Sequence, residues 1–172
     1  MLRFVKVSPE ARLHYLDLLL IGDEDPNMLR RYLDAGTLFA AIDETVPVGV
    51  AMVVPVDATT IELKNLAVLP ARRRQGIGAS LLRHVGLVYA PEYQDMLVGT
   101  GDVDFENLRF YMRQGFRFDA IRKHFFDQYA HPLYAEGMQL QDMVVLRRRL
   151  LLTGSDKTKE SCFWPKGADI LR

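Results

Sequence analysis

Apolar and polar positions follow two different periods in the first half of the chain, and each change of period marks an expected element. Runs rich in β-branched and other apolar residues predict strands, at residues 2–7, 37–43, 48–56 and 59–69. Short turns join the last three runs, which predicts an antiparallel meander. Ser8-Pro9 and Asp25-Pro26 are helix-start signals. They predict one helix from Pro9 to about Leu20 and a second helix through Asp34.

The second half of the chain alternates between helical and strand patterns. Apolar residues recur at helical spacing from Ile77 to Ala90, and an apolar run at 96–100 follows, which predicts a βαβ crossover with parallel neighbouring strands. A second helical stripe ends at Gly115 and carries Phe105, Leu108, Tyr111 and Met112. Two closing strands are expected at 116–126 and 142–150. The whole pattern predicts an α+β fold with a mixed sheet and helices on both faces.

Composition limits the classes of function. The chain has 172 residues, 49% of them hydrophobic, which suits one globular domain over residues 1–152 and a polar tail at 153–172. Basic and acidic residues number 22 each, so the zero net charge favours neither nucleic acid nor an anionic membrane as a partner. The single cysteine, Cys162, cannot form an internal disulfide, and the four histidines show no metal-ligand spacing, so no metal is expected. No export or membrane signal is visible, and a cytoplasmic setting is expected.

Residues 68–82, VLPARRRQGIGASLL, join a strand end to a helix start. Gly76 and Gly78 lie where the helix begins, so main-chain N–H groups there lack helical partners and attract an anion. Glycine also leaves room for a bulky phosphate, and the arginines at 72–74 add positive charge. The junction therefore predicts a phosphate or pyrophosphate site.

Two common nucleotide-binding patterns do not match this junction. A Walker loop needs Lys and then Ser or Thr after its last glycine, but Ala79-Ser80 follows Gly78. A dinucleotide-binding turn needs a third glycine where this chain has Leu81, and its glycines lie directly at the strand end. Neither a Walker loop nor a dinucleotide-binding turn is therefore expected.

The phrase LAVLPARRRQGIGASLL resembles the signature of the GNAT superfamily of acetyl-CoA-dependent N-acyltransferases, with Arg73, Gly76 and Gly78 at its defining positions. NLRFYMRQGFRF resembles the family's second motif, in which Tyr111 precedes Gly115-Phe116. The order of elements also matches, so the resemblance covers residues 2–150. It implies a GNAT-like, twisted and mostly antiparallel sheet of about six to seven strands, whose βαβ crossover carries the acyl-CoA site.

The resemblance also implies which residues hold acetyl-CoA, the expected acyl donor. Main-chain groups of the strand end would pair with the pantetheine arm like an added strand, at Leu66, Ala67 and Val68. The helix start would hold the pyrophosphate, at Arg73, Arg74, Gln75, Gly76, Ile77, Gly78 and Ala79. Many family members hold the pantetheine with an asparagine seven residues before the tyrosine. Here that position is Asp104, and Asn107 lies one turn later, so either residue could serve.

Two residues are candidates for proton transfer. Tyr111 matches the family residue that gives a proton to the departing thiolate, although its spacing alone would make it a core tyrosine. Glu62 is the candidate base for the attacking amine because it lies four residues before Leu66, on the same side of a regular strand. The alternative for Glu62 is a surface carboxylate paired with Lys64 or with solvent.

An acidic loop lies between the first two expected helices and borders the acceptor cleft in this fold. Its residues Asp23, Glu24 and Asp25 could attract a cationic amine. The favoured interpretation is that Asp25 caps the following helix while the other two side chains are solvated.

These features predict an enzyme that moves an acetyl or similar short acyl group from acetyl-CoA to a primary amine by direct attack in a ternary complex. The competing class is a non-catalytic acyl-CoA-binding sensor or protein-interaction module on the same fold. Fold analogy does not specify the acceptor, which is a small-molecule amine or an amine of a peptide or protein. An exposed final strand could support a homodimer.

Overall fold

The computed structural model describes residues 1–151, and the predicted tail at 153–172 lies outside the described residues. Its strands are β1 (Leu2–Val7), β2 (Thr37–Asp43), β3 (Val46–Pro55), β4 (Thr60–Val68), β5 (Asp95–Gly101), β6 (Arg117–Arg122), β7 (Tyr134–Ala135), β8 (Met138–Gln139) and β9 (Met143–Arg149). Its α-helices are α1 (Leu16–Gly22), α2 (Pro26–Leu33), α3 (Ile77–Tyr89) and α4 (Phe105–Arg113). Three short 3-10 helices complete the elements, at η1 (Pro9–Tyr15), η2 (Pro70–Arg72) and η3 (Phe125–Gln128).

The sheet confirms the predicted α+β architecture. Seven strands pair in the order β1-β2-β3-β4-β5-β9-β6, and β7 and β8 form a separate small hairpin. Within the large sheet only the β4–β5 pair is parallel, as expected from the crossover through α3. The expectation of an exposed final strand is wrong, because β9 lies between β5 and β6 and pairs with both. Among the described residues, no helix is long and apolar enough to span a membrane.

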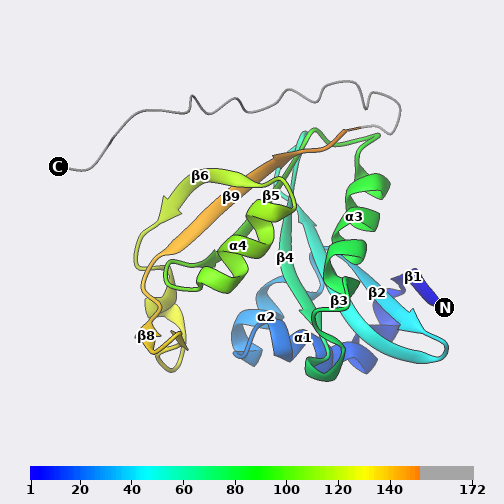
Figure 1. Cartoon of the computed structure of the whole chain (residues 1–172), viewed down its shortest axis with the longest axis horizontal. Coiled ribbons are helices and arrows are strands. Elements are labelled where there is room, and N and C mark those ends of the chain that lie inside the picture. The colour runs from blue at the N-terminus through cyan, green and yellow to red at the C-terminus, as the bar shows by residue number, and fades with distance from the viewer. Residues whose placement is uncertain (152–172) are drawn as a thin grey trace.

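Helices cover both faces of the sheet, as predicted (Figure 1). One core cluster joins α3 and α4 to the sheet and includes Leu81, Val85 and Phe116. The other joins η1, α1 and α2 to the opposite face and includes Leu19 and Leu29. Each such fully buried side chain contributes about 1.5–3 kcal/mol to stability relative to exposure. These two layers hold the central strands from both sides.

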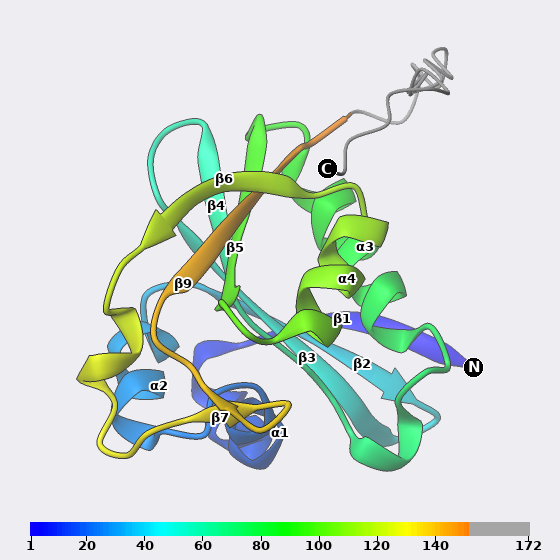
Figure 2. The ribbon, with the colours of Figure 1, turned by 60° about the vertical axis from the view of Figure 1, so that its left-hand side comes forward.

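The feature that creates the site is the divergence of β4 from β5. The two strands pair only from Thr60–Leu63 with Asp95–Val98. Opposite β3, the register of β4 shifts so that Lys64 has no partner, which is a β-bulge. Beyond the bulge, residues 65–68 stay paired with β3 on one edge and have no strand on the other. Figure 2 shows the two strands separating there. The open edge of β4 is able to accept an added strand.

Three helix and strand expectations need correction. The first helix is broken into the tighter η1 and α1, and Arg12 of η1 turns inward to bond the end of α2. Phe105 and Met112 are 50% and 38% exposed, because α4 turns only Leu108 and Tyr111 toward the core. The strand β6 ends at Arg122 because the chain then turns through a left-handed residue into η3.

Arg12 joins η1 to α2, and its replacement by alanine should destabilise the fold. The buried guanidinium donates to the carbonyls of Leu33 and Gly36 at the end of α2. Arg12→Ala leaves both carbonyls without this donor and opens a cavity, so we expect the free energy of unfolding to fall by about 2 kcal/mol or more. Urea unfolding measures the change. Arg30 is exposed, so Arg30→Ala should change the free energy of unfolding by less than about 0.5 kcal/mol. Equal losses of unfolding free energy in the two variants would contradict this role of Arg12.

Candidate active site

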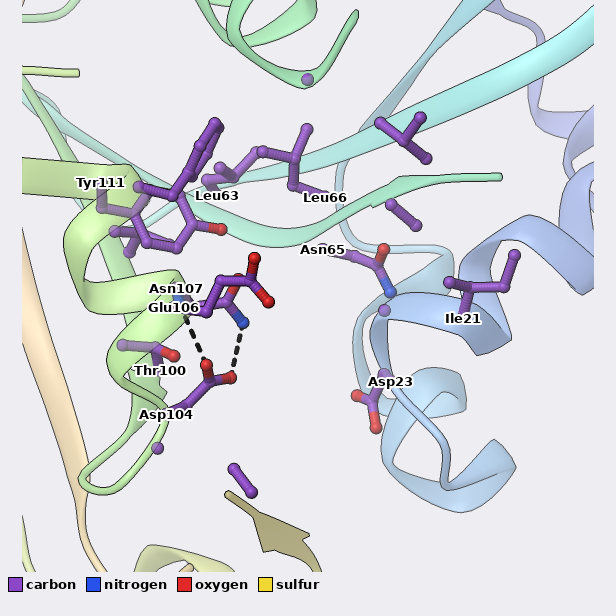
Figure 3. Close-up of a pocket in the computed structure, with 18 of the residues that line it drawn as sticks. Ile21, Asp23, Leu63, Asn65, Leu66, Thr100, Asp104, Glu106, Asn107 and Tyr111 are labelled. Atoms are coloured by element: carbon purple, nitrogen blue, oxygen red, sulfur yellow. Dashed lines mark hydrogen bonds between the residues drawn. The ribbon is translucent and has the colours of Figure 1, made fainter. Parts of the chain in front are cut away.

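A cavity of about 1050 Å³ opens where β4 and β5 diverge. It is lined by every residue predicted to hold acetyl-CoA or to transfer a proton, except Gln75 and Glu62. Figure 3 shows two facing walls, with Asp104, Asn107 and Tyr111 of the α4 side opposite Asn65 and Asp23. Residues far apart in the sequence therefore meet at the open edge of β4.

The start of α3 offers main-chain donors to this cavity. Ser80 N–H is the first to bond within the helix, to the carbonyl of Gly76, so the N–H groups of Ile77, Gly78 and Ala79 precede the helical ladder. Gly76 has a left-handed φ of 78°, and a Cβ atom there would meet nothing within 4 Å. The helix is 13 residues long, so its dipole adds positive potential at this end. The arrangement can bind a phosphate group.

The arginine side chains of the preceding loop are mostly engaged locally. Arg72 pairs with Asp43 at 2.7 Å and donates to Gln75, whose side chain therefore bonds within the loop and not in the cavity. Arg74 reaches across to Glu106 of α4, with 2.6 Å between Nη2 and Oε1. These contacts fix the shape of the loop, so the anion-binding groups are chiefly main-chain N–H groups.

Asp104 and Asn107 form one unit on the α4 wall. Asp104 is the N-cap of α4, and its Oδ1 accepts from the main-chain N–H of Asn107 at 3.0 Å. Its Oδ2 accepts from Asn107 Nδ2 at 2.6 Å. Both side chains line the cavity, and the dashed lines of Figure 3 mark the two bonds. Asp104 thereby orients the Asn107 amide.

Tyr111 brings a phenolic hydroxyl to the same cavity. Its side chain is only 7% exposed, and its ring packs edge-on against Phe110 and Phe116. Burial, and to a lesser extent the nearby charge of Asp104, raises the pKa of Tyr111 above its ordinary value. The hydroxyl therefore keeps its proton at neutral pH, which is the state that a proton donor needs.

Glu62 lies on the other side of the sheet from Leu66, and the expectation that they share a side is wrong. The bulge at Lys64 shifts the alternation by one residue, so Leu63 and Leu66 face the α3 side while Glu62 faces away. Glu62 is 8% exposed, and Lys64 Nζ and Arg122 Nη1 each lie 3.3 Å from its Oε1. Pairing with Lys64 agrees with one of the two interpretations from sequence, but the carboxylate is buried and not at the surface.

The acidic loop contributes Asp23 and the exposed Glu24 to the opposite wall of the cavity. Asp25 caps α2 through the N–H of Asn27 at 2.8 Å, as predicted. The expectation that Asp23 is solvated is wrong, because its carboxylate is partly buried and accepts from the Tyr32 hydroxyl at 3.0 Å. Within residues 1–151, no group of three or more potential metal ligands is found.

Comparison with known proteins decides the family. The acetyltransferase (GNAT) domain matches residues 34–118. A GNAT family acetyltransferase from Elizabethkingia anophelis, solved with acetyl-CoA bound, is 33% identical over 87% of this chain and 98% of that chain, with a TM-score of 0.82. This chain belongs to the GNAT family of acetyltransferases.

Two further relatives agree with this assignment. The N-acetyltransferase YvbK of Bacillus subtilis (strain 168) is 28% identical over 83% of this chain and 93% of its own length. A Bacillus subtilis acetyltransferase solved in complex with CoA is 29% identical over 88% of this chain and 100% of that chain, with a TM-score of 0.79. The protein is thus an acyl-CoA-dependent acetyltransferase.

Sequence reasoning missed several residues that line the cavity of this GNAT acetyltransferase. Asn65 is a polar residue inside the apolar run of β4, and Thr100 lies near the end of β5. A polar side chain between buried apolar neighbours is the signal that could have drawn attention to Asn65. Arg109 and Arg113 of α4 also line the cavity, and the helical pattern alone would place them in solvent.

Proposed function

We propose that this GNAT acetyltransferase moves an acetyl group from acetyl-CoA to a primary amine by direct attack in a ternary complex. The observation that carries the proposal is the meeting of three features in one cavity. These are the open edge of β4, the unpartnered N–H groups at the start of α3, and the Tyr111 hydroxyl. The relatives solved with acetyl-CoA and with CoA support the choice of donor.

Each of these features suits one part of the donor. The main chain of Leu66, Ala67 and Val68 would pair with the amides of the pantetheine arm along the open edge of β4. The amides from Arg74 to Ala79 would hold the pyrophosphate, and Asn107, oriented by Asp104, would hold the pantetheine from the α4 side. The donor supplies an activated thioester at the point where the two walls meet.

Two proton transfers accompany the exchange of bonds. The neutral amine forms a C–N bond with the acetyl carbon, and the C–S bond to coenzyme A breaks. Tyr111 gives its proton to the departing thiolate sulfur, and the tyrosinate is then reprotonated from solvent. The proton lost by the amine nitrogen passes to Glu62 through one water, because the carboxylate does not itself line the cavity. Both ion pairs of Glu62 among the described residues use Oε1, and this leaves Oε2 for that proton.

Glu62→Gln tests the base. The variant keeps the shape of the side chain and removes its proton-accepting charge, so we expect kcat to fall about tenfold or more with the Kd for acetyl-CoA unchanged. Assays of thiol release, made at a series of pH values from about 6 to 9, measure kcat. Lys64→Met is the control, because it removes one ion-pair partner and leaves the carboxylate with Arg122. A Gln variant with parental turnover, or one no slower than the Met variant, would exclude Glu62 as the base.

A sensor that binds acyl-CoA without turnover is the second candidate, and thiol release separates the two. The purified protein is mixed with acetyl-CoA and a panel of amines, amino acids and peptides, and free thiol and acetylated product are measured together. The enzyme proposal expects thiol and acetylated amine in equal amounts with at least one amine. Tight binding of acetyl-CoA with no thiol above background across the panel would favour the sensor.

A further inference from the structure

The wall of the cavity opposite Tyr111 carries a carboxylate that forms no ion pair with a described lysine or arginine. Asp23 lines the cavity, and Figure 3 shows it on the far side from the α4 residues. We propose that Asp23, held in place by Tyr32 and Asn65, forms a subsite for a second positive charge on the acceptor, which is therefore a diamine or polyamine. This inference rests on the proposed function and assigns a substrate class to the same site.

Asp23 is a carboxylate that the chain leaves uncompensated. Its hydrogen bonds come from the Tyr32 hydroxyl at 3.0 Å and from the N–H of Asp25 at 3.4 Å. No lysine or arginine in residues 1–151 forms an ion pair with it. Burial raises its pKa, as expected for a carboxylate that is partly removed from water with no cation beside it. An ammonium group of a ligand would supply the missing charge.

Asn65 gives a second, independent indication of a missing donor. It lines the cavity and is only 2% exposed. Its Nδ2 donates to the carbonyl of Leu19 at 2.8 Å and to the Tyr32 hydroxyl at 3.2 Å. Its Oδ1 is buried and has no partner among the described residues. A buried carbonyl oxygen without a donor is costly, but Oδ1 packs against Gly22 with almost no exposed surface, so an N–H group of a ligand reaches it only if the end of α1 shifts.

The network holds these groups in fixed positions. The amide of Asn65 donates to the Tyr32 hydroxyl, which in turn donates to Asp23. The carbonyl of Leu19 accepts from both Asn65 and the N–H of Asp23, which ties the end of α1 to β4. Tyr129 also lines this wall, and burial, followed by the charge of Asp23, raises the pKa of Tyr129. A carboxylate bordered by tyrosines is a suitable environment for an alkylammonium group.

The basic side chains nearest this wall are bonded to other residues, although Lys64 also lines the cavity. Lys64 Nζ bonds to Glu62 and lies 5.7 Å from the centre of the Tyr32 ring. Arg31 donates to Gln128 at 2.6 Å. An acceptor with a carboxylate at its second end would meet Asp23 on this wall, since Arg109 and Arg113 line the cavity from α4. The charges therefore favour a cation over an anion at this position.

The reaction itself explains why two charges are needed. The attacking nitrogen must be neutral, so in the reactive complex it cannot be the group that neutralises Asp23. In the proposed reaction the attacking nitrogen lies by Tyr111, and Figure 3 shows Asp23 on the opposite wall. The ammonium that meets Asp23 is thus a second group of the same molecule.

Three straight-chain primary amines of equal length test the proposal: 1,5-diaminopentane, pentylamine and 5-aminopentanoate. Calorimetry measures their binding to the full chain loaded with CoA, and thiol release with acetyl-CoA measures kcat/KM. We expect the diamine to bind about tenfold or more tightly than the other two. Asp23→Asn, which keeps an acceptor for Tyr32, should remove that preference. Asp17→Asn makes the same substitution at an exposed residue of α1 outside the cavity lining and should keep the preference within about threefold.

The outcomes separate this inference from the proposed function. The subsite is excluded if the diamine does not bind, if either other amine binds equally well, or if Asp23→Asn keeps the preference. Diamine binding that depends on Asp23 but is not followed by thiol release with any amine supports the subsite and overturns the proposed acetyl transfer. Thiol release with a preference for pentylamine or 5-aminopentanoate supports the transfer and overturns the subsite.

Discussion

Tyr111→Phe is expected to lower kcat by about 100-fold and to leave the Kd for acetyl-CoA within about threefold. The reason is that the ring keeps its packing against Phe110 and Phe116 while the cavity loses its proton donor. Burial raises the pKa of Tyr111, so its hydroxyl should stay protonated below about pH 9. The kcat of the parent enzyme should therefore show no loss from ionisation of this group in that range. Thiol release with a saturating acceptor gives kcat, and calorimetry gives the Kd.

A matched variant separates the hydroxyl from general effects on the core. Tyr93 packs edge-on against Tyr89 outside the cavity, so Tyr93→Phe makes the same chemical change away from the reaction. We expect the Tyr93 variant to keep parental kcat. If the Tyr111 variant turns over as fast as this control, Tyr111 is a core residue and not the acid.

Gly76→Glu is expected to weaken acetyl-CoA binding by about 100-fold or more. The new side chain would occupy the open space in front of the α3 N-terminus, and its carboxylate would compete with and repel the pyrophosphate. The left-handed backbone at this position adds strain of about 1 kcal/mol for any residue with a Cβ atom. Isothermal titration with acetyl-CoA measures the loss of affinity.

Gly137→Glu is the control for that experiment. Gly137 has a φ of 80°, and a Cβ atom added there would meet nothing within 4 Å, as at Gly76, but Gly137 lies outside the cavity lining. This variant should lose similar stability in urea and bind acetyl-CoA as the parent does. Equal affinities for the two glutamate variants would show that the pyrophosphate does not lie at the start of α3.

Local features of the sequence were sufficient to predict the residues that line the part of the cavity where we propose that the donor binds. The glycines and the strand end that precedes them act through groups close in sequence, since a helix start exposes its own N–H groups wherever it occurs. Gly76, Gly78 and Val68 therefore line the cavity as expected, and the spacing of Tyr111 places it on the inner side of α4. The mixed sheet followed from the same local patterns.

The positions of the residues that we propose for the acceptor side could not be predicted, because they depend on contacts between distant residues. The position of Glu62 follows from the bulge at Lys64, where two successive polar residues, Lys64 and Asn65, interrupt the alternation; the prediction assumes a regular strand. Asp23 is removed from water by the packing of α2 and the loop after β6, through Tyr32 and Tyr129. Nothing in the short acidic loop itself distinguishes Asp23 from its exposed neighbour Glu24.

Hydrogen exchange with and without acetyl-CoA tests the central claim most directly, namely that the donor lies along the open edge of β4 and on the start of α3. We predict slower exchange of main-chain amides at residues 66–68 and 74–79, because these N–H groups gain partners. The sheet edge at β1 serves as the internal reference and should not change. Saturating acetyl-CoA that leaves exchange at both segments unaltered would contradict this placement.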